Sequence, residues 1–294
     1  MEIVTLERGR TRASIAPEAG GRLLQLEIED RGRWLRLLRA PRDRERALAE
    51  PTRWGSFPMA PWPNRIDGGR FVWRGRVYEV PVQHGRHALH GRGCFQPWTV
   101  ERASATACRI AVTFDAGWPF GGGAVQEFRM LDDGIALRME IHADGEAFPA
   151  GCGWHPWFWR DVRPGHDVRL LVDAERWYET DDEIPTGWLK AALGEHDLRR
   201  YAALGSRRLD ACYRAPRGRL RIGWGDVELT MEQSPNATHA VVYTPPEAVC
   251  VEPQTCAIDA FNLEAQGIAG AGMAVVAPGH PLVATTTWRW RIGR

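Results

Sequence analysis

The chain has 294 residues, of which 44% are hydrophobic, so it is long enough and apolar enough to bury a sizeable core. Its 38 basic and 37 acidic residues give a formal net charge of +1, without the basic excess that a nucleic-acid-binding surface needs. No stretch approaches the roughly 18 apolar residues of a membrane span, and the six cysteines include no Cys-x-x-Cys pair. We therefore expect a cytoplasmic protein with reduced thiols that binds neither nucleic acid nor membrane.

Apolar residues recur at every second position along most of the chain, which is typical of half-buried strands. The clearest such segments are residues 71–80, 125–144, 219–232 and 282–292. Asp132-Asp133-Gly134 and Gly225-Asp226 interrupt two of them and are turn sequences that predict hairpins. Many short antiparallel strands over this length favour a large β-sandwich.

Helix candidates are few. Only residues 41–50 and 188–204 have a composition that suggests a helix, and Gly194 weakens the second. No long linker or low-complexity tract divides the sequence, so we predict an all-β chain with few short helices and a single domain over residues 1–294.

Three histidines occur close together at positions 84, 87 and 90. A metal site needs imidazoles on one side of the backbone, but on a strand position 87 faces away from the other two. Gly85 and Gly91 disfavour the helix that could change this. We predict no metal site here, and a polar loop in which one histidine is functional.

Two other polar segments are candidates for binding. Asn64 and Arg65 follow a Pro-x-Pro run, which would order their donors for a hydroxyl or carboxylate group. Asp210 lies beside apolar residues, and its simplest interpretation is a turn residue or a surface ion pair.

His155 lies in the aromatic sequence GWHPWFW. Taken alone, a buried histidine is more often a core residue that donates to a backbone carbonyl. The neighbouring aromatic rings point the other way, because indole and phenyl faces commonly pack against the C–H groups of a sugar ring.

Glu252 ends the apolar run Val249-Cys250-Val251 and is followed by Pro253, so we expect it at the end of a strand. A carboxylate in apolar surroundings is paired, functional or at an exposed strand end, and partial desolvation would raise its pKa toward that of a general base. The sequence has no nucleophile elbow, phosphate loop or dinucleotide fingerprint. The remaining chemistry is proton transfer between a carboxylate and one or more histidines.

Six segments, taken in chain order, resemble the aldose 1-epimerase (galactose mutarotase) family. They are NRIDGGRF (64–71), LHG (89–91), HPWF (155–158), DDEIPTG (181–187), LDACY (209–213) and VCVEPQT…DAFN (249–262). Each is a weak motif alone, but their shared order is a strong signal. Two positions depart from the family pattern. Trp154 stands where well-known sugar-specific members carry Asn, and Arg92 follows Leu-His-Gly with a shortened spacing. Both departures concern the identity of the sugar.

The resemblance implies a large twisted β-sandwich of the galactose mutarotase type that uses no cofactor and acts on a small-molecule sugar as a monomer or homodimer. It implies Glu252 as general base and His155 as general acid in the interconversion of α and β anomers. His90, Arg65 and Asp210 would then bind sugar hydroxyls, with Asn64 beside them. A carboxylate close to His155 should raise the pKa of that histidine modestly, which suits an acid near neutral pH.

Two alternatives remain open at this point. An epimerase of a phosphorylated or otherwise anionic hexose would need several arginines converging on the anion, and Arg65, Arg86 and Arg92 are available. A non-catalytic carbohydrate-binding protein on the same fold would have no need of an acid and base pair.

Overall fold

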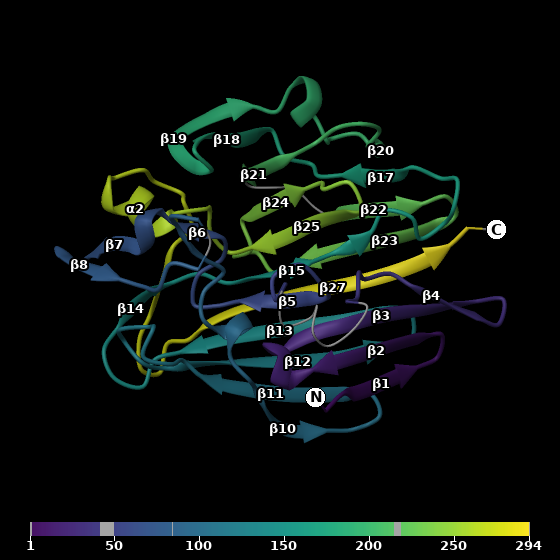
Figure 1. Ribbon diagram of the computed structural model, residues 1–294, viewed down its shortest axis with the longest axis horizontal. Helices are drawn as coiled ribbons and strands as arrows, with labels where there is room; N and C mark the ends of the chain where they lie inside the picture. The colour runs from purple at the N-terminus through teal and green to yellow at the C-terminus, as the bar shows by residue number, and fades with distance from the viewer. Residues whose placement is uncertain (1, 42–49, 84, 215–218, 294) are drawn as a thin grey trace.

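The computed structural model describes residues 2–41, 50–83, 85–214 and 219–293. Within these ranges two large sheets pack face to face as a β-sandwich (Figure 1). Neighbouring strands in both sheets are antiparallel, as in the pairs at the centre of each sheet. The expected all-β sandwich is therefore confirmed.

The first sheet has 12 strands in the order β1-β2-β3-β5-β15-β25-β24-β21-β18-β19, with β4 paired to β3 and β16 paired to β25. Its strands are β1 (Val4–Arg8), β2 (Thr11–Ala16), β3 (Arg22–Asp30), β4 (Arg33–Arg36), β5 (Ser56–Met59), β15 (Gly153–Pro156), β16 (Phe158–Trp159), β18 (Arg176–Asp181), β19 (Ile184–Ala191), β21 (Asp210–Arg214), β24 (His239–Tyr243) and β25 (Ala248–Gln254).

The second sheet has nine strands in the order β10-β11-β12-β13-β27-β23-β22-β17-β20. They are β10 (Thr99–Ala103), β11 (Ala107–Thr113), β12 (Gly123–Leu131), β13 (Gly134–His142), β17 (Val168–Leu171), β20 (Ala202–Ala203), β22 (Leu220–Trp224), β23 (Val227–Gln233) and β27 (Leu282–Ile292).

Smaller elements decorate the sandwich. Three two-stranded ribbons are β6 (Arg65–Ile66) with β9 (Ala88–Leu89), β7 (Arg70–Trp73) with β8 (Arg76–Glu79), and β14 (Phe148–Ala150) with β26 (Ala274–Val276). Among the described residues, the helical elements are α2 (Ala260–Ala265) and four 3₁₀ turns, η1 (Pro17–Ala19), η2 (Asp67–Gly69), η3 (Gly93–Phe95) and η4 (Gly194–His196). No helix in these described ranges is long and apolar enough to span a bilayer.

Side-chain alternation builds the core between the two sheets. On β13 the residues Ile135, Leu137, Met139 and Ile141 are buried, as their spacing predicts. They join one large apolar cluster with inward-facing residues of the first sheet. Burying each such side chain contributes about 1.5–3 kcal/mol to stability. The apolar residues of a strand therefore determine which of its two faces packs against the core. The hairpin turns expected at 132–134 and at Gly225-Asp226 are confirmed by the β12–β13 and β22–β23 pairs.

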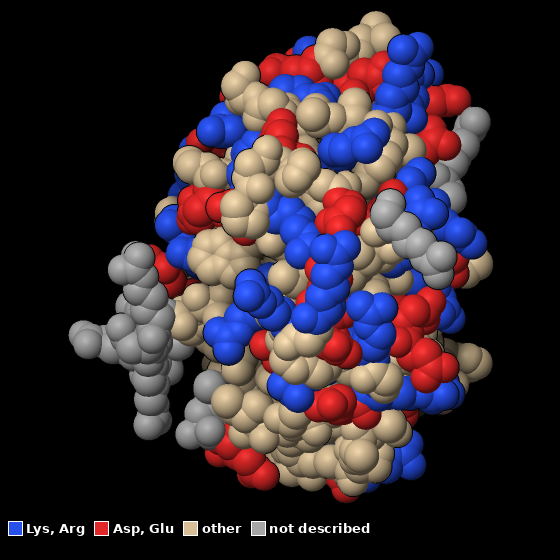
Figure 2. Space-filling view, turned by 90° about the vertical axis from the view of Figure 1, so that its right-hand side faces the viewer, with Lys and Arg blue, Asp and Glu red and all other residues tan. Residues whose placement is uncertain are grey.

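At the end of the sandwich that forms the right-hand side of Figure 1, basic and acidic residues are interleaved on the surface (Figure 2). Many of them pair with one another, as do Arg291 Nε with Glu228 Oε1 at 3.0 Å and Arg163 Nε with Asp226 Oδ1 at 2.8 Å. Both pairs are partly exposed, and surface ion pairs contribute about 0–1 kcal/mol each, so they keep the surface polar more than they stabilise the fold.

The two helix candidates have different outcomes. Residues 188–204 do not form a helix: the segment continues β19 to Ala191, makes the turn η4 and includes β20. Leu189 pairs with Tyr178 of β18, and the gain from completing this hairpin overrides a weak local helix propensity. The other candidate, residues 41–50, falls on positions 42–49, which lie outside the described residues.

Candidate active site

Glu252 lies inside β25, on the face of the first sheet that points away from the second sheet. Strand alternation sends Val249 and Val251 into the core and Glu252 to the opposite side, where its side chain is 1% exposed. The predicted strand end is wrong, because Pro253 and Gln254 continue β25. The extended φ of proline still fits a strand, and only one ladder hydrogen bond is lost.

His155 lies on the neighbouring strand β15 and faces the same side as Glu252. Its Nε2 is 3.2 Å from Glu252 Oε1. The imidazole is stacked between Phe57, with ring centroids 4.7 Å apart, and Trp157, at 5.5 Å. The edge of His90 approaches at 5.0 Å. These rings fix the orientation of the imidazole, so the contact with Glu252 does not depend on a free rotamer.

Burial controls the protonation of this pair. Desolvation raises the pKa of Glu252 well above its ordinary value, and the nearby Asp210 carboxylate adds to the rise. Desolvation lowers the pKa of His155 to about 3, and the positive charge of Arg65 acts in the same direction. The expected upward shift of the His155 pKa is therefore wrong, because burial outweighs the neighbouring carboxyl group. Both shifts favour the uncharged forms, so a proton shared by the pair is favoured on Glu252 over His155.

Asn64 directly precedes β6, and Arg65 is the first residue of that strand. Asn64 Oδ1 accepts a hydrogen bond from Arg65 Nη1 at 3.0 Å, so the amide orients the guanidinium. Arg65 Nη2 lies 2.9 Å from Glu183 Oε1 and 4.0 Å from Asp210 Oδ2. Its Nε is buried and has no hydrogen-bond partner in the described structure.

His90 reaches the site because β6 pairs with β9, which places Arg65 opposite Leu89. The His90 amide donates to the Asn64 carbonyl oxygen at 2.8 Å. His87 points elsewhere, with its Nδ1 3.2 Å from Asp67 Oδ1, so these two histidines do not converge on one point. His84 lies outside the described residues.

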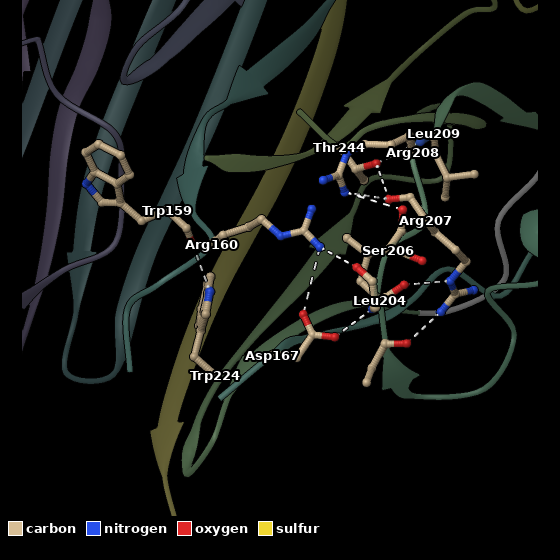
Figure 3. Close-up of polar contacts among 12 residues, drawn as sticks. Trp159, Arg160, Asp167, Leu204, Ser206, Arg207, Arg208, Leu209, Trp224 and Thr244 are labelled. Atoms are coloured by element: carbon tan, nitrogen blue, oxygen red, sulfur yellow. Dashed lines mark hydrogen bonds and ion pairs between the residues drawn. The ribbon is translucent and has the colours of Figure 1, made fainter. Parts of the chain in front are cut away.

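Asp210 is the first residue of β21, and the segment before it is held by the polar contacts in Figure 3. Arg160 Nη2 donates to the Gly205 carbonyl oxygen at 2.8 Å, and the Leu209 amide donates to Thr244 Oγ1 at 2.7 Å. Desolvation raises the pKa of Asp210, while Arg65 opposes the rise. Asp210 therefore belongs to the site and is more than the turn residue that its local sequence suggests.

A cavity of about 620 Å³ brings these groups together, within the usual range for small-molecule sites. All six predicted site residues line it: Asn64, Arg65, His90, His155, Asp210 and Glu252. The sequence analysis missed several other lining residues, namely Gln83, Phe95, Trp157, Glu183 and Tyr243. Trp157 could have been found from its place in GWHPWFW, and Glu183 lies in the segment 181–187 that resembles the family, although that resemblance gave it no role.

The two departures from the family pattern lie outside this cavity lining. Trp154 faces the core, where its Nε1 donates to Gln126 Oε1 of β12 at 3.3 Å. Arg92 pairs with Asp115 through two hydrogen bonds, of 2.9 and 2.6 Å. Neither side chain is therefore placed to contact a molecule in this cavity directly.

One group of described residues brings metal-type ligand atoms together: His155, Cys250 and Glu252, with the atoms within 4.8 Å of one another. Cys250 packs in an apolar cluster with Phe57 and Trp157. Burial raises the pKa of its thiol well above the ordinary value, whereas a metal ligand must be a thiolate. The donor set therefore fits a metal poorly, and we assign none.

Similar folds occur in several solved structures. A galactose mutarotase-like protein from Clostridium acetobutylicum superposes with a TM-score of 0.88 at 19% identity, covering 99% of this chain and 95% of that one. Galactose 1-epimerase from Lactobacillus acidophilus NCFM superposes with a TM-score of 0.81 at 14% identity, covering 99% and 95%. At these identities the likeness concerns the fold alone.

Sequence comparison gives the family. Two Escherichia coli K12 proteins match over part of their length, YphB at 32% identity over 105 residues and YihR at 26% over 131 residues. The matches cover 35% and 42% of this chain, and 36% and 42% of those relatives. The family model for aldose 1-epimerase matches residues 2–287. The chain therefore belongs to the aldose 1-epimerase family.

Proposed function

We propose that this protein is an aldose 1-epimerase that interconverts the α and β anomers of an aldohexose by opening and reclosing the ring. The observation that carries the proposal is the buried pair of His155 Nε2 and Glu252 Oε1, 3.2 Å apart, at the cavity. Ring opening needs one group that removes the C1 hydroxyl proton and another that protonates the ring oxygen. A pair holding one proton on two basic sites provides both.

The steps can be written from these two residues. When polar sugar groups enter the cavity, the proton of Glu252 moves to His155, which leaves a carboxylate and an imidazolium. Glu252 takes the C1 hydroxyl proton as His155 gives its proton to the ring oxygen. The O–H electrons form the C1 carbonyl, and the C1–O bond breaks toward the ring oxygen. After rotation about the C1–C2 bond, the reverse steps close the ring on either face.

The remaining lining residues suit a sugar. The guanidinium of Arg65 is a donor and Asp210 an acceptor for hydroxyl groups, and His90 lies next to His155. Trp157 offers an aromatic face, on which the axial C–H groups of a pyranose can pack. A ligand held in this way needs neither a charge nor a metal of its own.

The arginines considered for an anionic hexose favour the neutral-sugar alternative. Arg86 pairs with Asp182 at 2.9 Å, and Arg92 with Asp115. Arg65 pairs with Glu183, so each of the three already has a carboxylate partner. An anion would have to displace a carboxylate before it could pair with any of them.

Anomeric exchange followed by NMR tests the proposal. Purified wild type should accelerate exchange at C1 of one or more neutral aldoses, and Glu252→Gln should lower the rate about 10²–10⁴-fold while the protein stays folded. A fully active Glu252→Gln variant would contradict the assignment of the base. Sugar binding without accelerated exchange in the wild type would instead support the carbohydrate-binding alternative.

A further inference from the structure

The hairpin formed by β18 and β19 ends in a two-residue turn, Asp182-Glu183, at the edge of the first sheet. Both residues have positive φ, 45° for Asp182 and 66° for Glu183. Two-residue turns of this geometry strongly prefer Asn, Asp or Gly, and a long side chain such as glutamate is unfavourable there. Turn propensity alone therefore does not explain Glu183.

The two acidic residues of this turn have different partners. Glu183 points into the cavity and contacts Arg65, a side chain that is only 9% exposed. Asp182 contacts Arg86, where both side chains are more than half exposed and neither lines the cavity. Neighbouring carboxylates on one turn thus provide a site residue and a matched control.

Glu183 changes the charge that a ligand would meet. Besides His90, His155 and Tyr243, the ionisable side chains of the cavity wall are the basic Arg53 and Arg65 and the acidic Glu50, Glu183, Asp210 and Glu252. Burial raises the pKa of Glu252 well above its ordinary value, which disfavours its charged form, and Glu50 lies 3.8 Å from Arg39. Glu183 lies 2.9 Å from Arg65 Nη2, closer than Asp210 at 4.0 Å, so removing the Glu183 charge leaves the guanidinium with the more distant Asp210 and makes it more available to an anion.

We propose that Glu183 determines specificity: by pairing with Arg65 it excludes sugars that carry a carboxylate, sulfate or phosphate group. This inference rests on the proposed function, since it assigns the cavity to a sugar. A carboxylate fixed at the cavity wall repels an incoming anion, and it also occupies the cation to which the anion would bind. Uncharged aldoses meet neither obstacle.

D-Glucose and D-glucuronate are suitable probes because they share one ring and differ at C6. Their dissociation constants should be measured by NMR titration for wild type, Glu183→Gln and Asp182→Asn. We expect wild type to prefer glucose, and we expect Glu183→Gln to shift the affinity ratio toward glucuronate by about tenfold. This factor lies between those expected for a charge pair in bulk water and for one near a protein surface. Asp182→Asn should leave the ratio unchanged, and added salt should shrink the shift.

The ratio separates a charge effect from a structural one. If Glu183→Gln weakens the affinity for both sugars by equal factors, the residue only supports the fold of the site. That result would overturn the proposal. The proposal would also be overturned if Glu183→Gln and Asp182→Asn shifted the affinity ratio equally, or if wild type bound glucuronate tightly. Binding is measured without turnover, so an inactive protein that still binds sugar would refute the proposed reaction while leaving this test intact.

Inorganic sulfate is a probe that needs no sugar. Sulfate binding should be weak in wild type and stronger in Glu183→Gln, detected through the tryptophan fluorescence of the cavity wall, which includes Trp157. Asp182→Asn is again the control. If Glu183→Gln gains no affinity for sulfate, Glu183 does not exclude anions from Arg65 and the inference fails, whichever sugar the protein prefers.

Discussion

Replacing Glu252 by glutamine should change how the stability of the fold depends on pH. Glutamine has the shape of the protonated acid and can still accept from Gln254 Nε2, which lies 3.1 Å from Glu252 Oε2. In the wild type, burial raises the folded pKa of Glu252 above the unfolded reference of about 4.3. A raised pKa stabilises the native state fully below the unfolded pKa, and this stabilisation is lost as pH rises toward the folded value.

The magnitude follows from proton linkage. Over this interval the free energy of unfolding of the wild type should fall relative to Glu252→Gln by about 1.4 kcal/mol per pH unit. His155 titrates in both proteins, so its contribution cancels to first order. In the wild type alone, the unfolded pair and the folded pair each bind one proton between about pH 4.3 and 6.5. The contribution of this pair to the free energy of unfolding is therefore nearly independent of pH in that range. Above it, the contribution falls as pH rises.

Urea unfolding at several pH values between 6 and 9 measures this difference. Val251→Ala is a suitable control because Val251 lies on the same strand and faces the core. It should lower stability by the same amount at every pH, since it changes packing without changing a charge. Parallel curves for wild type and Glu252→Gln would refute the reasoning, because they would mean that Glu252 is already ionised in the resting protein.

Three further predictions concern the wall of the site. Asn64→Ala should raise KM several-fold with a smaller effect on kcat, because the amide only orients Arg65; steady-state kinetics on the preferred aldose would test this, and an unchanged KM would contradict it. Trp157→Ala should lower kcat as well as raise KM, because the indole is stacked on His155 and holds its orientation. An effect on KM alone would mean that Trp157 only contacts the sugar. Gly91→Ala should lower the melting temperature by several degrees, because φ is +74° and a Cβ would lie 2.1 Å from the Ala60 carbonyl oxygen; unaltered thermal unfolding would count against the close approach.

Period-two patterning was sufficient to predict the fold class, because an alternating strand has one stable orientation against a core. The same pattern failed at residues 188–204, where apolar and charged residues mix without a clear period. There the outcome depends on pairing with β18, a partner that the local sequence does not identify. The position of Glu252 inside β25 was missed for a similar reason, since the strand continues past Pro253 and local rules treat proline as a boundary.

The site could be anticipated in its residues but not in its electrostatics. His155 and Glu252 were both identified, yet their contact depends on β15 and β25 being neighbours in the sheet. The opposite shifts of their pKa values depend on how completely the surrounding rings and loops exclude water. The sequence analysis predicted correctly that desolvation raises the pKa of Glu252, but it predicted a raised pKa for His155, which burial lowers.

Glu183 shows most clearly where substrate preference can reside in this chain. Strand alternation divides the central strands into a core face, with Trp154 and Val251, and a site face, with His155 and Glu252. The site face supplies groups that any ring-opening epimerase requires, so it offers little basis for choosing between sugars. Discrimination must then come from the elements that cover it. The turn carrying Glu183 is one of these, and it joins two strands at the sheet edge, away from the central strands that carry His155 and Glu252. We therefore expect sugar preference in this protein to follow changes at that turn and in the covering loops, and to be insensitive to conservative changes at Trp154.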